Sequence, residues 1–175
     1  MSDVLLRVAA SVAVVAAVAG TAGADGGFSI GGRPVWFVTG GATAGGTVAA
    51  DRGGAFAGGE LGLVRLRENR FAGLYADAYY DFGADQAYVT LGPELGLIRR
   101  SRTFPIAVGV DGGAAFRTGG DGVGGIGAAG RVFVSLLGSF AVYGRYVYLD
   151  SGEHAVQLGV TLKLPLAPPF GAGAP

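Results

Sequence analysis

The chain has 175 residues, of which 50% are hydrophobic and 15% charged, and its 13 basic and 13 acidic residues cancel to a formal net charge of zero. This balance predicts one folded domain and argues against a disordered chain or a nucleic-acid-binding protein. The sequence holds 35 glycines and no cysteine, so an exported form could not rely on disulfides and would be stabilised by closure of a sheet or by a membrane.

The N-terminus has the features of a secretory signal peptide. Arg7 precedes the apolar run 8–19, and the small residues Ala22, Gly23 and Ala24 form a cleavage site. The run is too short for a membrane-spanning helix, and no later stretch is long and apolar enough for one. We therefore expect a cleaved signal peptide in residues 1–24, a glycine-rich lead in 25–33, a folded domain in 34–166 and a flexible C-terminal tail in 167–175.

From residue 34 onward, apolar residues alternate with small or polar ones at a period of two, which is the spacing of a β-strand. The third segment is the clearest, with Leu74 and Tyr80 on one face and Asp77 on the other. Pro93 interrupts the fourth, where we expect a β-bulge because proline cannot donate to the ladder and a closed barrel has no free edge. The expected strands lie within 34–48, 55–64, 71–82, 87–97, 106–116, 126–136, 140–148 and 155–164.

Eight segments of about ten residues joined by short turns are typical of an antiparallel meander, and their length suits tilted membrane-spanning strands. Segments two to seven each carry a charge near mid-length, on the face opposite the larger aliphatic side chains. We therefore predict an all-β protein, an eight-stranded antiparallel up-and-down transmembrane β-barrel whose aliphatic face contacts lipid. A soluble lipocalin-like barrel or sandwich has a similar strand count and is the alternative.

The aromatic residues of the aliphatic face avoid its middle. Amphipathic rings prefer the headgroup level of a bilayer, so two aromatic belts around an aliphatic band indicate two membrane interfaces. The other explanation is that aromatic residues are common in strands. One belt would contain Tyr80, Phe82, Phe116, Tyr146 and Tyr148, and the opposite belt Trp36, Phe140 and Phe104.

The last strand carries the most motif-like stretch, in which Gln157 is followed two residues later by Gly159 and then by hydrophobic positions including Leu162 and Leu164. In this motif and in its strand pattern, nearly all of the mature chain resembles the small eight-stranded outer-membrane barrels of bacteria, the OmpA/OmpX type. The resemblance implies an outer-membrane location, contact with membrane lipid, and a C-terminal signal that the outer-membrane assembly machinery reads. The chain departs from the family by having leucines where aromatic residues are typical and by continuing to Pro175.

The lumen is where any chemistry would lie, and up-and-down topology places strand two across from six, three from seven, and four from eight. An eight-stranded barrel is just wide enough for side chains to fill, and an unpaired charge inside it would cost on the order of several kcal/mol. We therefore expect an ion-paired, largely plugged lumen. The expected pairs are Glu60 with Arg131, Asp77 with Arg145, and Glu94 with Lys163, and Asp111 joins them without a base of its own.

Two roles fit this barrel. A plugged lumen favours a structural or surface-interaction role, for which a monomer is expected and no specific partner can be named. Small lumen residues leave space and so favour a narrow porin-like channel for small molecules or ions. The lumen glycines that support the channel are Gly62, Gly73, Gly92, Gly96, Gly109, Gly127 and Gly159.

Two further patterns have the form of cofactor or catalytic motifs. Residues 125–130 match the G-x-G-x-x-G dinucleotide fingerprint, but one such match is expected by chance in so glycine-rich a chain, and strand-like residues follow it instead of a helix. Ser151, Glu153 and the single histidine, His154, are residue types of a hydrolase triad, but adjacent loop residues rarely have triad geometry. We expect no enzyme activity, no cofactor and no metal site, with an outer-membrane lipid hydrolase as the remaining alternative.

Charge separates the two ends of the expected barrel. The turns 65–70 and 99–102 hold six arginines and only Glu68 against them, whereas the opposite end collects Asp51, Asp81, Asp85, Asp121, Asp150 and Glu153. Chains of this kind begin in the periplasm, so an even strand number places both termini and the basic turns there. The arginines would then either contact anionic headgroups, each worth up to about 1 kcal/mol, or simply be solvated.

Overall fold

The computed structural model describes residues 34–50, 52–100, 105–119, 124–136 and 139–167. The expected signal peptide and lead, residues 168–175 of the tail, and Asp51, Arg102, Phe104 and Asp121 lie outside the described residues.

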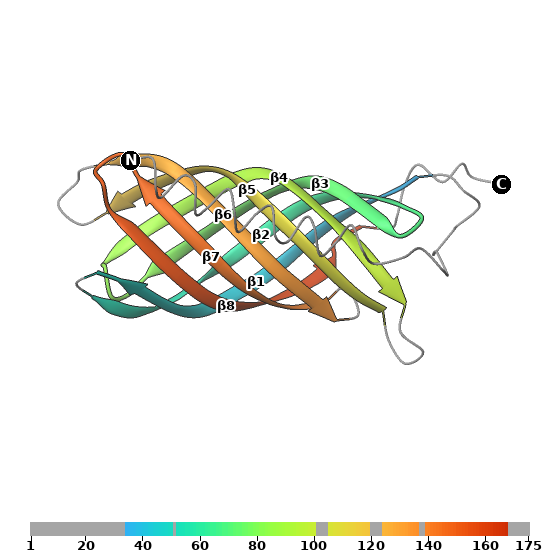
Figure 1. The fold of residues 1–175 in the computed structure, drawn as a ribbon, viewed down its shortest axis with the longest axis horizontal. Coiled ribbons are helices and arrows are strands. Elements are labelled where there is room, and N and C mark those ends of the chain that lie inside the picture. The colour runs from blue at the N-terminus through green and yellow to red at the C-terminus, as the bar shows by residue number, and fades with distance from the viewer. Residues whose placement is uncertain (1–33, 51, 101–104, 120–123, 137–138, 168–175) are drawn as a thin grey trace.

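The described chain forms eight antiparallel strands that close into one barrel in chain order, tilted against its long axis (Figure 1). Each strand pairs with its neighbours in sequence, and the last strand closes on the first, with Gly40 opposite Leu164 and Ala49 opposite Ala155. The predicted fold class is therefore confirmed. The strands are β1 (Val35–Ala49), β2 (Gly53–Arg67), β3 (Arg70–Asp81), β4 (Gln86–Arg100), β5 (Pro105–Gly119), β6 (Gly125–Leu136), β7 (Phe140–Leu149) and β8 (His154–Pro165). No helix of the described chain has the length and hydropathy needed to cross a bilayer.

The alternation of side chains places the charges inside the barrel and the aliphatic residues outside. Glu60 is 2% exposed while its neighbour Leu61 is 59% exposed, and Gln157 is 1% exposed beside Leu158 at 68%. A soluble barrel buries its aliphatic face, whereas a transmembrane barrel presents that face to lipid and keeps polar residues in the lumen. The observed arrangement is that of a transmembrane barrel.

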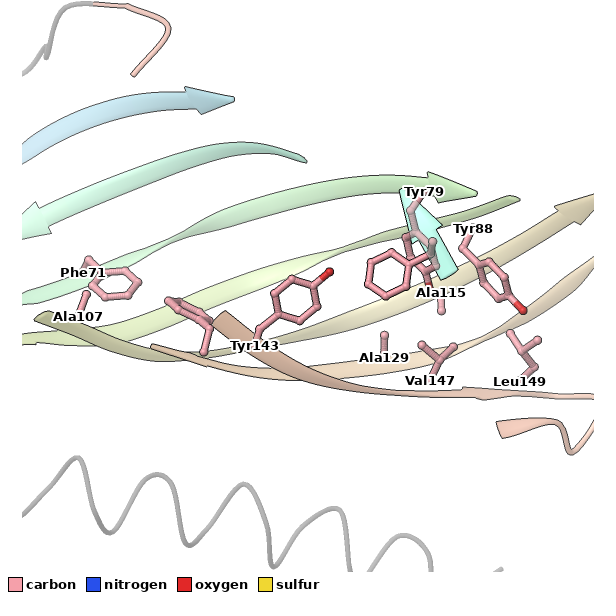
Figure 2. Packing of buried hydrophobic residues seen from close by; sticks show 11 residues of the cluster. Phe71, Tyr79, Tyr88, Ala107, Ala115, Ala129, Tyr143, Val147 and Leu149 are labelled. Carbon is pink, nitrogen blue, oxygen red and sulfur yellow. The ribbon is translucent and has the colours of Figure 1, made fainter. Parts of the chain in front are cut away.

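Aromatic rings fill the lumen on both sides of the buried charges. Phe71 lies toward the end at which β1 begins, while Tyr79 and Tyr88 lie toward the other end, with Tyr143 between them (Figure 2). The rings of Tyr79 and Tyr88 stack with centroids 5.1 Å apart and an interplanar angle of 5°. The rings of Phe71 and Phe133 pack against each other at an angle, with their centroids 6.1 Å apart. One aromatic pair therefore lies in the lumen on each side of the charged layer.

Two details of the strands differ from the sequence expectation. The expected bulge at Pro93 is wrong: Leu91 pairs with Ala114 and Glu94 with Asp111, so two residues on each strand separate these pairs and none is extra. The pairing of β4 with β5 is instead interrupted over those two residues, which accommodates the missing N–H of the proline.

The second difference concerns the stretch 65–70, which was expected to be a turn. β2 continues to Arg67 and β3 begins at Arg70, so the turn contains only Glu68 and Asn69. The inward positions Val64 and Leu66 keep the alternation running through the arginines, which therefore occupy outward strand positions. Arg99 likewise belongs to β4.

Candidate functional site: the buried charge network

Arg131 is the centre of the charges in the lumen. Its Nη1 lies 2.5 Å from Glu60 Oε2 and its Nε lies 2.6 Å from Asp111 Oδ2. Asp111 and Arg131 are direct neighbours on β5 and β6, whereas Glu60 reaches them from β2. All three residues are buried, so the guanidinium of Arg131 loses its hydration. Charge-assisted hydrogen bonds to two carboxylates compensate for that loss.

Arg145 forms a second centre toward the ring stack of Tyr79 and Tyr88. It donates to Asp77, which lies on β3 across the barrel, and to the side-chain oxygen of Gln157 at 3.3 Å. Its guanidinium carbon lies 4.8 Å from the ring centroid of Tyr79 and 5.2 Å from that of Tyr143. Because Arg145 is 2% exposed, these cation–π contacts act in a desolvated setting, where they are strongest.

Lys163 joins Glu60 to the remaining carboxylate, Glu94. Its ammonium contacts Glu60 and lies 3.3 Å from Glu94. The structure therefore brings together all three opposite-strand pairs that the topology indicated, and Asp111 shares Arg131 with Glu60. The result is a network of five charged residues around Arg131 and Lys163. The Arg145–Asp77 pair lies beside it, and the ring of Tyr143 contacts both guanidinium groups.

Sequence reasoning missed a group of neutral, hydrogen-bonded residues beside this layer. The Tyr143 and Thr43 hydroxyls are 2.6 Å apart, and Thr161 donates to Thr43 at 3.4 Å. The inward parity of these three residues was visible in the sequence, but the register that places β1 beside β8 and near Tyr143 was not. A further ion pair joins Arg117 to Glu153 at the end of the barrel where β1 ends.

A comparison with solved structures gives similarity to Neisserial surface protein A, with a TM-score of 0.55, 11% sequence identity, and coverage of 75% of this chain and 97% of that one. This chain has the fold of the small eight-stranded outer-membrane barrels. Weaker similarity, with TM-scores of 0.36, links it to a de novo designed transmembrane β-barrel (13% identity, covering 76% of this chain and 96% of that one) and to Ail of Yersinia pestis, solved with the heparin analogue sucrose octasulfate (14% identity, 75% and 99%). No protein-family model and no curated sequence matches the chain.

The lumen glycines lie close to aromatic rings and to the backbone of neighbouring strands. A Cβ added to Gly96 would collide with the Phe71 ring, and a Cβ added to Gly109 would collide with the Phe133 ring. A Cβ added to Gly159 would lie 2.7 Å from the Tyr143 ring. Cβ atoms on the remaining four would meet a neighbouring side chain or strand backbone; these four are Gly62, Gly73, Gly92 and Gly127. Aromatic rings and adjacent strands therefore occupy the volume that the missing side chains vacate.

The aromatic residues of the outer face lie near the two ends of the barrel. Tyr80, Phe82, Phe116, Tyr146 and Tyr148 lie toward the end where β1 finishes, whereas Trp36 and Phe140 lie near the end where it begins. The rings of Tyr80 and Phe82 contact each other edge to face at 5.3 Å. Between the two groups the outer face is mainly aliphatic, as shown by Leu74, Leu91 and Val160.

The residues of the expected assembly signal divide between the two faces of β8. Gln157 is buried in the lumen. The ring of Tyr143 occupies the space that a side chain at Gly159 would fill. Leu162 and Leu164 face outward and are 52% and 54% exposed.

The two motif-like patterns are placed as follows. Residues 125–130 lie within β6, so they form neither the tight turn nor the helix start that a dinucleotide fingerprint requires. Ser151 is in the turn before β8, Glu153 pairs with Arg117, and the His154 ring faces Tyr146 at 6.3 Å. Within the described ranges, no cluster of three or more His, Cys, Asp or Glu side chains is arranged to hold a metal ion.

Proposed function

We propose that the protein is an integral outer-membrane barrel with a closed lumen, which acts as a structural or surface-interaction element of the membrane and carries no solute. The observation that supports this most strongly is the buried layer of Arg131, Arg145 and Lys163 with four carboxylates, in which each cation pairs with at least one carboxylate. Its members come from β2 to β8, and Arg131 and Glu60 are 3% and 2% exposed. A solute would have to displace desolvated charges from each other, which costs several times the thermal energy, on the order of several kcal/mol.

A narrow channel is the second candidate, and the feature that favours it is the abundance of lumen glycine. Rings and neighbouring strands take up that volume, and the aromatic pairs Tyr79–Tyr88 and Phe71–Phe133 lie on opposite sides of the charges. The stacked Tyr79–Tyr88 pair and the tilted Phe71–Phe133 pair both favour the closed barrel.

The outer surface supports the membrane part of the proposal. An aliphatic band lies between two groups of aromatic residues, which matches the hydrocarbon core and the two interfaces of a bilayer. Membrane lipid is thus the first partner, the assembly machinery of the outer membrane is the second, and the protein acts as a monomer without enzymatic activity. The signal-peptide pattern of residues 1–24 supports export.

Cell fractionation tests the location. The mature protein should co-sediment with outer-membrane markers and stay in the pellet after washing with high salt, because its attachment is hydrophobic and not electrostatic. On gels it should migrate differently before and after boiling, as a folded barrel does. Recovery of the intact mature chain in the soluble periplasmic fraction would contradict the proposal.

Orientation in the membrane is a second testable part of the proposal. Glu68 and Asp85 provide a matched pair, because both are exposed turn residues with positive φ (56° and 54°) and they lie at opposite ends of the barrel. With periplasmic termini, a cysteine at position 85 on intact cells should react with a membrane-impermeant thiol reagent, and one at position 68 should react only after the outer membrane is permeabilised. Labelling in the reverse pattern would contradict the orientation.

A further inference from the structure

Four arginines form a basic patch at the end of the barrel where β1 begins, on the right in Figure 1. The patch consists of Arg65 and Arg67 on β2, Arg70 on β3 and Arg99 on β4, and all four are exposed. Their strand parity is that of the outward-facing Leu63, so the side chains leave from the lipid-facing surface and not from the lumen.

The basic patch covers only one side of the barrel. At the same end, the outward positions of the described parts of β5 to β8 are apolar, as shown by Ile106, Leu136, Phe140 and Leu164. A charged rim that served only solubility would be expected around the whole circumference. The concentration on three adjacent strands points to a localised partner.

The arginines within the patch repel one another unless an anion lies between them. Arg67 and Arg70 are directly opposite on β2 and β3, a placement that destabilises a strand pair when the charges are alike. Among the described residues, none of the four arginines takes part in an ion pair. A negatively charged partner from outside the chain would remove the repulsion.

The position of the patch along the barrel axis, next to the aliphatic band, indicates which kind of anion would bind. Leu63 and Leu95 of the aliphatic band lie within a few residues of the arginines along β2 and β4. The guanidinium carbon of Arg65 lies 5.9 Å from the ring centroid of Trp36, the residue type that prefers the headgroup level. A bound anion would therefore lie at the boundary between acyl chains and water, where lipid phosphates are found.

We propose that the basic patch binds the phosphate of an anionic glycerophospholipid, with the acyl chains lying along the aliphatic face of β2 to β4. Guanidinium groups bind phosphate oxygens in pairs of parallel hydrogen bonds, and two facing arginines can hold one phosphate between them. This inference rests on the proposed membrane function and deepens it by naming a lipid class and a place for it.

The test compares unfolding in two kinds of vesicle. Protein is folded into phosphatidylcholine vesicles, or into the same vesicles with about one-fifth phosphatidylglycerol, and the urea midpoint is read from the heat-modifiable gel band. The anionic lipid should raise the midpoint of the wild type. Arg67→Gln and Arg70→Gln should each reduce the lipid-dependent gain in the folding constant about fivefold, the equivalent of about 1 kcal/mol, and the double variant should lose most of it.

Arg52→Gln is the control, because Arg52 is an arginine at the opposite end of the barrel, between β1 and β2. It should keep the phosphatidylglycerol effect. In pure phosphatidylcholine the Arg67→Gln/Arg70→Gln variant should be at least as stable as the wild type, since it removes the like-charge pair. Inorganic phosphate added to phosphatidylcholine vesicles should not reproduce the lipid effect.

Three results would overturn the lipid site: the double variant keeps the full effect, Arg52→Gln loses as much of it as Arg70→Gln, or free phosphate raises the midpoint as much as the lipid does. Failure of the wild type to give a heat-modifiable band in either vesicle would instead overturn the membrane barrel on which the site depends.

Discussion

Replacing Arg131 with alanine should lower the free energy of unfolding by about 3–5 kcal/mol, the range measured when one partner of a buried ion pair is removed. The substitution would leave the carboxylates of Glu60 and Asp111 in the lumen with only Lys163 in contact with Glu60. Urea unfolding in lipid vesicles, followed by the heat-modifiable gel band, measures the loss. Arg52→Ala, which removes a charge outside the layer, should change stability by less than about 0.5 kcal/mol.

A double-mutant cycle separates the pairing from a general intolerance of change at position 131. Glu60→Ala combined with Arg131→Ala should cost clearly less than the sum of the two single losses, because each single substitution already removes the contact between the two residues. The coupling should be at least about 1 kcal/mol. Strictly additive losses would show that Glu60 and Arg131 do not interact in the folded protein.

Gly113→Val should destabilise the barrel by about 3 kcal/mol or more, at the upper end of the cost of overfilling a packed interior. A Cβ at this lumen position would collide with the carbonyl oxygen of Leu91 and would lie 2.7 Å from the Cα of Gly92, both of which are backbone atoms of β4. Backbone cannot move aside without opening the β4–β5 seam. The measurement is again the urea midpoint in vesicles.

Gly130→Val is the control for the glycine prediction, because it makes the same substitution on the neighbouring strand but on the outer face. A Cβ there has no atom within 4 Å, and a β-branched residue suits a lipid-facing strand. Its stability should equal or exceed that of the wild type. Equal destabilisation at positions 113 and 130 would mean that loss of glycine, and not collision in the lumen, determines the effect.

Much of the barrel could be predicted from the sequence, because two-residue periodicity and chain order are enough to assign faces and opposite strands. The placement of Glu60 opposite Arg131 and of Asp77 opposite Arg145 follows from strand number and parity alone. The sharing of Glu60 between Arg131 and Lys163 does not follow, since it depends on the reach of a lysine side chain across the layer.

The differences from the sequence expectation at Pro93 and in the stretch 65–70, and the surroundings of the lumen glycines, have separate physical causes. Proline and charged residues are, on average, signals of bulges and turns. In this closed barrel of long strands, the register of β4 with β5 is the same on both sides of Pro93. Val64 and Leu66 keep inward positions, so β2 continues through the arginines. The volume beside a glycine depends on which ring the neighbouring strand supplies, and that is a property of register. Local sequence therefore predicts which face of the strand a residue occupies, but not which residue lies beside it on the neighbouring strand.

A closed lumen is tested most directly by recording current across a planar lipid bilayer. Purified wild-type protein, shown to be folded by its heat-modifiable band, should add no stepwise conductance to the protein-free baseline, whereas Arg131→Ala in the same bilayer should conduct, because it removes the cation that joins Glu60 to Asp111. Reproducible single-channel steps from the folded wild type would contradict the closed barrel and establish the narrow channel in its place.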